Sequence, residues 1–308
     1  MEGVGTRHGR CWEKALPYVA VLTAMLFWGG SGIATKVALH TLRPLTLVTC
    51  RFVLAVFLML LVGLATRTLQ RVNRKDIPLF LLAGFAQPVC YYVFETYGIQ
   101  LLSSPTIAEV LLSTGPLFAP LFAYVLIRER VTLYNIVGIA VSGLGVLLMI
   151  IVGGTNYSIG SPWGILLAFL AVFAAVFYTV LLRKIPVGYN SLSVVFYVQL
   201  CSLLFFVPMF CVVDLPKVSI SDFALSSVGA ICYLAICSSV IAFVLFCYTV
   251  RKIGVTRANA FNNIRPVFTA LLMLLLFGEH LPWVTLVGMG LVIVGLFVCQ
   301  YDGQRQKG

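Results

Sequence analysis

Ten long apolar runs take up most of this 308-residue chain and leave little room for any other kind of fold. Each run is close to the roughly 20 residues that an α-helix needs to cross a lipid bilayer. Their approximate limits are 16–37, 44–65, 77–98, 104–127, 133–152, 162–182, 191–213, 223–250, 257–277 and 283–301. Only 10% of the residues are charged, whereas a soluble domain carries about 25%. The sequence therefore predicts an all-α polytopic membrane protein with ten transmembrane helices.

The basic residues indicate how these runs are oriented. The formal net charge is +11, and Lys and Arg concentrate beside alternate ends of the runs. They precede the first run and follow the second, fourth, sixth, eighth and tenth, whereas the loop at 153–162 has none. Because basic flanks resist translocation, these ends and both termini are expected in the cytoplasm. Topology thus accounts for the positive charge, and no nucleic-acid partner is expected.

A repeat becomes visible when the sequence is shifted by 150 residues. The matched pairs are Thr106 with Thr256, Ala108 with Ala258, Pro116 with Pro266, Phe118 with Phe268, Glu129 with Glu279, Gly138 with Gly288 and Gly145 with Gly295. Each half has five runs, an odd number, so two similar halves enter the membrane from opposite sides. We expect an N-terminal five-helix repeat at 1–152 and an inverted one at 153–308, within one membrane domain. Such repeats are common in carriers that alternate between inward-open and outward-open states.

Three segments carry a resemblance to a known family. They are "IGVTRANAFNNIRPVFTALLMLLLFGEHL" (253–281), its weaker partner ending "RERV" (128–131), and "LFWGGSGIATK" (26–36). Together with the Gly-rich fifth and tenth runs, they resemble the EamA family of the drug/metabolite transporter superfamily over nearly the whole chain. The resemblance implies ten helices in two inverted halves and carriage of small metabolites, often export of amino acids or related compounds. One position departs from the family pattern, because the residue before the proline of the ninth run is usually apolar and here is Arg265.

Polar side chains within the runs mark the predicted substrate site. A polar group in hydrocarbon is costly unless it is satisfied, so those that remain should face the bundle interior. At about 100° per residue, the polar residues of the first, third, fourth and ninth runs each fall on one stripe. The predicted substrate-binding residues are Trp28, Gln87, Tyr91, Glu109, Tyr178, Asn259, Asn262, Asn263 and Arg265.

Arg265 is the most informative of these residues. It follows the expected cytoplasmic end of its run by about eight residues, which at about 1.5 Å per residue places it near the midplane. Ionisable residues at that depth are rare and usually functional. One interpretation makes Arg265 a fork for a substrate carboxylate or phosphate. The other pairs it with Glu109 or with helix carbonyls, and both remain open at this stage.

The other charges within the runs are Lys36, Arg51, Glu95 and Glu109. We expect them to form ion pairs, with proton coupling at the carboxylates as the alternative, because burial raises a carboxyl pKa. Three intramembrane cations against two carboxylates favour a small zwitterionic or anionic substrate. Pro116 and Pro266 are predicted to kink their helices, since each frees a carbonyl one turn earlier.

The alternative function is an intramembrane serine hydrolase. "GGSG" (29–32) matches the GxSG of rhomboid-like proteases and would make Ser31 the nucleophile. A histidine base would have to lie within hydrogen-bond reach, but all three histidines fall in loops or the tail.

No HExxH, CxxC or GxxxxGK[ST] pattern occurs in the sequence, so we expect neither metal, cofactor nor catalytic residues. The protein is predicted to be a secondary carrier rather than an enzyme, in a bacterial inner membrane. Its expected partners are a small-molecule substrate and the lipid bilayer. The oligomeric state, a monomer included, stays open.

Overall fold

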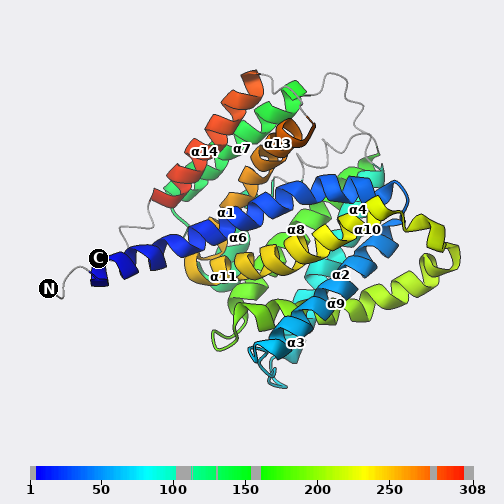
Figure 1. Ribbon diagram of the computed structural model, residues 1–308. Coiled ribbons are helices and arrows are strands. Elements are labelled where there is room, and N and C mark those ends of the chain that lie inside the picture. Colours follow the sequence, from blue (N-terminus) through cyan, green and yellow to red (C-terminus); the bar gives the residue numbers. More distant parts are fainter. Residues whose placement is uncertain are drawn as a thin grey trace.

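The computed structural model describes residues 5–101, 112, 114–129, 131–153, 161–277 and 283–301, and this part of the chain is helical without strands (Figure 1). The helices of the first half are α1 (Gly5–Leu39), α2 (Pro44–Ala65), α3 (Ile77–Gly84), η1 (Phe85–Cys90), α4 (Tyr91–Leu101), α6 (Gly115–Ile127) and α7 (Leu133–Gly153). Those of the second half are α8 (Pro162–Lys184), α9 (Ser191–Val213), η2 (Leu215–Lys217), η3 (Ile220–Asp222), α10 (Leu225–Tyr233), η4 (Leu234–Ala242), α11 (Phe243–Ile253), α12 (Val255–Ala260), η5 (Phe261–Ile264), α13 (Arg265–Phe277) and α14 (Trp283–Tyr301).

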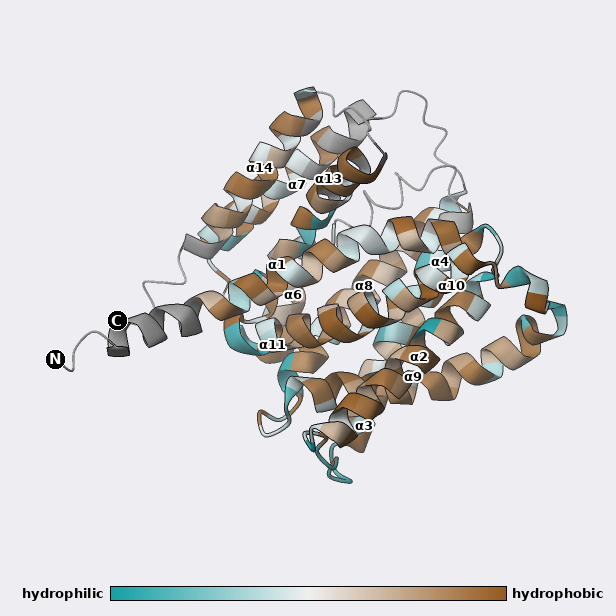
Figure 2. Cartoon of the chain, viewed as in Figure 1, coloured by the Kyte–Doolittle hydropathy of each residue, from teal (hydrophilic) through white to brown (hydrophobic). Residues whose placement is uncertain are grey.

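Six helical stretches of the described residues are long and apolar enough to cross a membrane. They are Ala15–Leu39, Pro44–Ala65, Ile77–Gly98, Pro162–Lys184, Ser191–Val213 and Leu225–Ile253. Three shorter apolar helices, Gly115–Ile127, Leu133–Gly145 and Leu286–Cys299, fall within further predicted runs. Hydrophobic residues predominate along the helices (Figure 2), and large apolar side chains are exposed, for example Leu64, Val125 and Phe297 at 62%, 65% and 75%. An outer surface of this kind suits lipid.

The ninth predicted run is divided rather than continuous. α12 ends at Ala260, the 3-10 turn η5 follows, and α13 begins at Arg265. The break coincides with adjacent asparagines and with the proline at 266, which has no N–H to donate.

The equivalent helix of the first half has matching ends, because α6 and α13 begin and end 150 residues apart. Pro116 lies in the first turn of α6, where proline is tolerated, and most of the preceding residues of the fourth run lie outside the described ranges.

Two π-helical segments occur at related places in the halves. η1 interrupts the third run and η4 the eighth, and the two ranges overlap after the shift of 150 residues. Within η1, Gln87 has extended backbone angles, with φ −149° and ψ 121°. A π-helical segment accommodates an extra residue and loosens the regular bonding between amide and carbonyl groups, which often marks a functional place.

The helices α7 and α14 lie side by side (Figure 1) and approach each other through glycines. A Cβ atom added to Gly138 would lie 2.5 Å from the carbonyl oxygen of Gly295, and one added to Gly145 would lie 2.5 Å from that of Gly288. These contacts are reciprocal with respect to the repeat, since Gly138 corresponds to Gly288 and Gly145 to Gly295. Other contacts come in corresponding pairs, with α1 packed on α13 and α6 on α8, and with α2 packed on α9.

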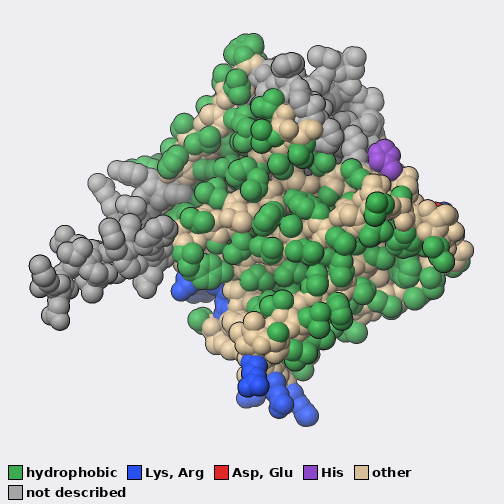
Figure 3. Space-filling view, in the orientation of Figure 1, with side chains coloured by type: hydrophobic (Ala, Val, Ile, Leu, Met, Phe, Trp, Pro, Cys, Tyr) green, Lys and Arg blue, Asp and Glu red, His purple; other side chains and the backbone are tan. Residues whose placement is uncertain are grey.

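Basic loops meet at one end of the bundle, where Lys and Arg gather in Figure 3. The hydroxyl of Tyr189 donates to Asp76 Oδ2 over 2.6 Å, which joins the loop after α8 to the loop after α2. Arg251 Nη2 donates to the carbonyl of Pro186 over 2.7 Å, which joins the end of α11 to the loop after α8. Glu129 accepts 3.0 Å hydrogen bonds from the backbone amides of Val255 and Thr256, so the segment after α6 caps α12. The loops predicted to share one side are thus found together.

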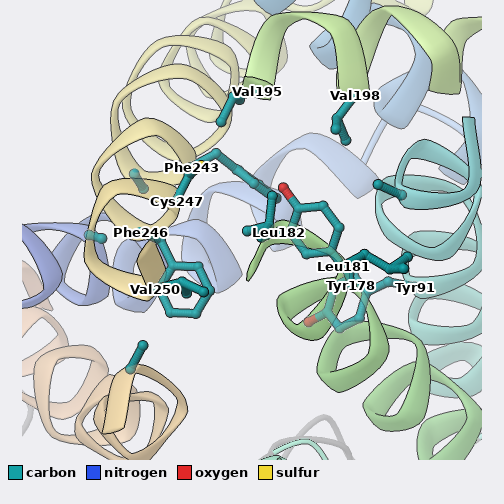
Figure 4. Packing of buried hydrophobic residues seen from close by; sticks show 14 of the residues in the cluster. Tyr91, Tyr178, Leu181, Leu182, Val195, Val198, Phe243, Phe246, Cys247 and Val250 are labelled. Atoms are coloured by element: carbon teal, nitrogen blue, oxygen red, sulfur yellow. The ribbon is translucent and has the colours of Figure 1, made fainter. Parts of the chain in front are cut away.

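The main core lies where α8, α9 and α11 meet α1 and α4. In Figure 4, Phe243, Phe246 and Val250 project from α11 toward Tyr178, Leu181 and Leu182 of α8. The Tyr178 ring is 1% exposed and lies 6.3 Å from that of Phe243. This packing fixes the polar helix faces that line the candidate site.

Candidate functional site

A small pocket of about 30 Å³, room for about two water molecules, lies between α1, α2 and α4. Its polar lining consists of Thr35 from α1, Arg51 from α2, and Tyr92, Glu95 and Thr96 from α4. The remaining wall is apolar and includes Leu39, Leu47 and Val48. In this conformation the pocket is too small for a metabolite, but a few polar groups that converge in a largely apolar lining are usual in a small-molecule site.

Arg51 is the most constrained of the lining residues. It is 4% exposed and donates from Nε to Ser239 Oγ over 2.6 Å. Its Nη2 atom donates to Ser238 Oγ over 2.8 Å and to the Tyr92 hydroxyl over 2.9 Å. The guanidinium carbon also lies 4.7 Å from the centre of the Tyr92 ring. An ion pair was predicted for Arg51, whereas its hydrogen-bond partners among the described residues are hydroxyl groups.

The π-helical segment η4 is the point to which these side chains attach. Besides its two serine hydroxyls, the Ser238 carbonyl accepts from the indole N–H of Trp28 over 3.1 Å. The Ser239 carbonyl accepts from Gln199 Nε2 over 2.6 Å. Irregular bonding within η4 makes such carbonyls available to side chains from other helices. As a result, α1, α2 and α9 are all tied to one segment of the eighth run.

A second cationic position lies next to Trp28. The guanidinium carbon of Arg265 is 5.8 Å from the centre of the Trp28 ring, close enough for a cation–π contact. Trp28 packs in turn on Phe243 and Phe246, with ring centroids 5.2 and 5.1 Å away. Its half-buried indole therefore forms part of a polar wall and part of the core at once.

The two cationic positions are connected through α4. The hydroxyl of Tyr91 donates to Glu95 Oε1 over 2.8 Å, and the rings of Tyr91 and Tyr92 contact each other at 4.9 Å. Tyr92 interacts electrostatically with Arg51, with Glu95 and with Arg265. The predicted residues Trp28, Tyr91, Glu95 and Arg265 thus belong to the same neighbourhood as Arg51.

The three predicted asparagines are bonded largely within their own segment. Asn259 Nδ2 donates to the carbonyl of Val255 over 3.0 Å, and Asn262 Nδ2 donates to Asn259 Oδ1 over 3.2 Å. Asn263 is 1% exposed and donates to Ser142 Oγ of α7 over 2.6 Å. These bonds stabilise the irregular turn at η5 and join it to α7.

Other predicted residues lie elsewhere or outside the described residues. Tyr178 is in the core, and its buried hydroxyl has no hydrogen-bond partner within the described ranges. Gln87 is half-buried in η1. Glu109 and the side chains of Lys36 and Pro266 lie outside the part of the chain that the structure describes.

The serine of the alternative function bonds within its own helix. Ser31 Oγ donates to the carbonyl of Trp28 over 2.7 Å, in the manner of a helical serine. The side chain of His40, the histidine whose side chain is described, is exposed beyond the end of α1. The described residues contain no group of three or more side chains suited to hold a metal ion.

Sequence reasoning missed Ser238, Ser239 and Tyr92 as partners in this site. The adjacent serines of the eighth run were a usable signal, because two hydroxyls in succession are uncommon in a stretch so apolar. Helical periodicity did not single them out, since η4 departs from the regular α-helical repeat.

Comparison with known proteins identifies the family. The profile of the EamA-like transporter family matches the chain twice, at residues 15–151 and 162–300. An uncharacterized transporter of Archaeoglobus fulgidus is 26% identical over 283 residues, which cover 91% of this chain and 97% of that protein.

Two further relatives have names that state a substrate. The S-adenosylmethionine/S-adenosylhomocysteine transporter of Chlamydia trachomatis serovar L2 is 26% identical over 306 residues, 96% of this chain and 92% of that protein. A probable terminal-alkyne amino-acid exporter of Streptantibioticus cattleyicolor is 28% identical over 232 residues, 74% of this chain and 75% of that protein.

A crystal structure with 19% sequence identity has the same fold, with a TM-score of 0.78 over 95% of this chain and 99% of the other. The family profile covers most of the sequence, and the described helices include six that are apolar and long enough to cross a bilayer. The chain is therefore a multi-pass integral membrane protein that belongs to the EamA-like transporter family.

Proposed function

We propose that the protein is a secondary-active carrier that exports a small zwitterionic or anionic metabolite, such as an amino acid or an organic anion. The observation that carries this proposal is the pocket between α1, α2 and α4, which is lined by both a buried arginine and a carboxylate. Charged groups inside a membrane domain are costly and usually mark a substrate or ion pathway.

The proposed mechanism is alternating access between two inverted five-helix repeats, 1–152 and 153–308. Its support is the reciprocal glycine contact of α7 with α14, the equal limits of α6 and α13, and the two matches of the family profile. Inverted repeats have two equivalent arrangements, so a pocket between them opens to either side as the halves rock. We further propose that both termini lie in the cytoplasm, as the basic loops favour.

The proposed substrate class follows from charge and from two relatives. Arg51 lines the pocket, and Arg265 interacts electrostatically with Tyr92 in the pocket wall, so both favour an anionic group on the substrate. The named substrates of the two relatives, S-adenosylmethionine and a terminal-alkyne amino acid, each carry an amino-acid head group. An amino acid or a close derivative is consistent with both observations.

Counterflow in proteoliposomes tests the carrier function. Vesicles that hold the purified protein are loaded with an unlabelled solute, and uptake of the same labelled solute from outside is followed. The panel contains several L-amino acids, S-adenosylmethionine and a simple dicarboxylate. We expect transient accumulation of at least one zwitterion or anion, dependent on the protein and independent of ATP. Absence of counterflow for every solute, or covalent labelling of Ser31 by a serine-hydrolase reagent, would contradict the proposal.

A further inference from the structure

Arg51 is a buried cation whose described partners are all neutral. Its three hydrogen bonds go to the hydroxyls of Tyr92, Ser238 and Ser239. Hydroxyl groups orient a guanidinium but do not neutralise it, and a buried charge without a counter-ion is expensive. Glu95 lines the same pocket, yet no hydrogen bond joins these two described side chains.

The bonding pattern leaves one end of the guanidinium for a ligand. The atoms Nε and Nη2 are engaged, whereas Nη1 has no partner among the described residues. Arg51 also lines the pocket directly. The hydroxyls on η4 and α4 fix the guanidinium plane, so little conformational freedom is lost when an anion binds.

Glu95, the carboxylate in the pocket lining, could bind a positively charged group of the same ligand. Glu95 lies one helical turn from Tyr91, which donates to its Oε1 atom, and Thr35 and Thr96 add hydroxyls to the same lining. A guanidinium binds a carboxylate through charge-assisted hydrogen bonds, and a carboxylate binds an ammonium group in the same way. Both partners exist, a short distance apart, in the head group of an α-amino acid.

We propose that Arg51 and Glu95 form a head-group subsite, in which Arg51 binds the carboxylate and Glu95 the ammonium of an α-amino acid. The inference rests on the proposed carrier function and deepens it, because it assigns recognition to a pocket apart from the Arg265 position beside Trp28. The pocket must widen to admit the ligand, as rocking of the two halves would allow, and the rest of the ligand then extends toward the apolar wall formed by Leu47 and Val48. Because polar residues bind the head group and apolar residues contact the rest of the ligand, the site should be specific for the head group and should tolerate different amino-acid side chains.

Ligand-dependent thermal stabilisation in detergent tests the subsite. The probes are L-methionine, L-threonine and L-phenylalanine, together with two methionine analogues, one without the amine and one without the carboxylate. The variants are Arg51→Lys, which keeps the buried charge but lacks the planar fork, and Glu95→Gln, which keeps the size of the side chain. Arg74→Lys, on an exposed loop, is the matched control.

Arg51→Lys should weaken binding of the carboxylate, and Glu95→Gln should weaken binding of the ammonium group. Arg51→Lys should bind each amino acid about tenfold more weakly, but should bind the carboxylate-free analogue as the wild type does. Glu95→Gln should weaken binding of the amino acids and of the carboxylate-free analogue about tenfold, but not that of the amine-free analogue. The comparison between analogues on one variant separates recognition from a general loss of folding.

Three results would overturn the inference. Equal loss for all ligands in both variants would assign a purely structural role to these residues. Unchanged affinities in both variants would place the head group elsewhere. Absence of stabilisation by any amino acid, while another solute shows counterflow, would reject the subsite and leave the carrier function standing. Counterflow of no solute at all would instead reject the carrier function itself.

Discussion

Gly138 of α7 and Gly295 of α14 meet so closely that a Cβ atom on either would lie 2.5 Å from the carbonyl oxygen of the other. The contact brings one helix from each half of the sequence into backbone proximity. Small residues permit such an approach, and van der Waals packing then holds the pair together in a lipid environment. This contact gives a structural reason for the glycines in both the fifth and the tenth run.

Gly138→Ala should therefore destabilise the protein. A methyl group at this position has no space against the backbone of α14, and overpacking costs about 1–3 kcal/mol. Gly143→Ala is the matched control on the same helix, because a Cβ atom there meets nothing within 4 Å. Alanine also favours an α-helix over glycine, so the control should be neutral or stabilising. Thermal unfolding in detergent measures both, and equal behaviour of the two variants would contradict the close contact.

Gly254→Ala should destabilise the junction between α11 and α12. Gly254 has a φ of +90°, a conformation that residues with a side chain adopt only under strain, of about 1–3 kcal/mol. A Cβ atom there would also lie 3.0 Å from Glu129 Oε1, which accepts the amide of Thr256. Gly188→Ala, where the added atom meets nothing within 4 Å, is the control. A melting temperature unchanged by Gly254→Ala would show that the strained turn contributes nothing to stability.

Arg265→Ala should abolish stabilisation by the transported solute while leaving insertion and folding intact. The expected reason is loss of the cation that lies against Trp28. The assay is thermal unfolding with and without the solute identified by counterflow, and Arg74→Ala on an exposed loop is the control. Full stabilisation and unchanged uptake in the Arg265→Ala variant would remove this residue from the substrate site.

Single-cysteine labelling should separate the two ends of the bundle. Gly188 lies in the loop after α8, next to Tyr189, whose hydroxyl donates to Asp76. Ile220 is 92% exposed and lies between α9 and α10. Cysteines introduced at these positions in a cysteine-free background should react with an impermeant maleimide from opposite sides. The basic flanks predict that position 188 is reached only from the cytoplasmic side. Labelling of both positions from one side would refute the proposed orientation.

Much of the fold could be predicted because hydropathy reports directly on spanning helices. The predicted limits 44–65, 191–213 and 283–301 coincide with α2, α9 and α14. In the ninth run the sequence predicted a kink at Pro266, whereas hydropathy, which averages over a window, did not register the four-residue 3-10 turn η5 before it. The kink at Pro116 stays a prediction, because most residues of the fourth run before it lie outside the described part of the chain.

The candidate site could be predicted only in part. Helical periodicity predicted Trp28, Tyr91 and Arg265 as site residues, because each lies on a polar stripe of its helix. The hydrogen bonds of Arg51 with Ser238 and Ser239 join residues more than 180 positions apart and depend on a π-helical segment. No local pattern encodes the distance between such side chains.

The sequence by itself determined that this chain is a multi-spanning helical protein with two related halves. Few backbone structures satisfy their hydrogen bonds inside a bilayer, and the repeat is visible in the aligned residues. Only the tertiary structure decided which polar groups meet, and which of them are already satisfied. It assigned the asparagines of the ninth run mainly to local bonds and left Arg51 with neutral partners beside a pocket. The physical reason is that hydrophobic insertion depends on summed composition, whereas recognition depends on the directions of a few hydrogen bonds.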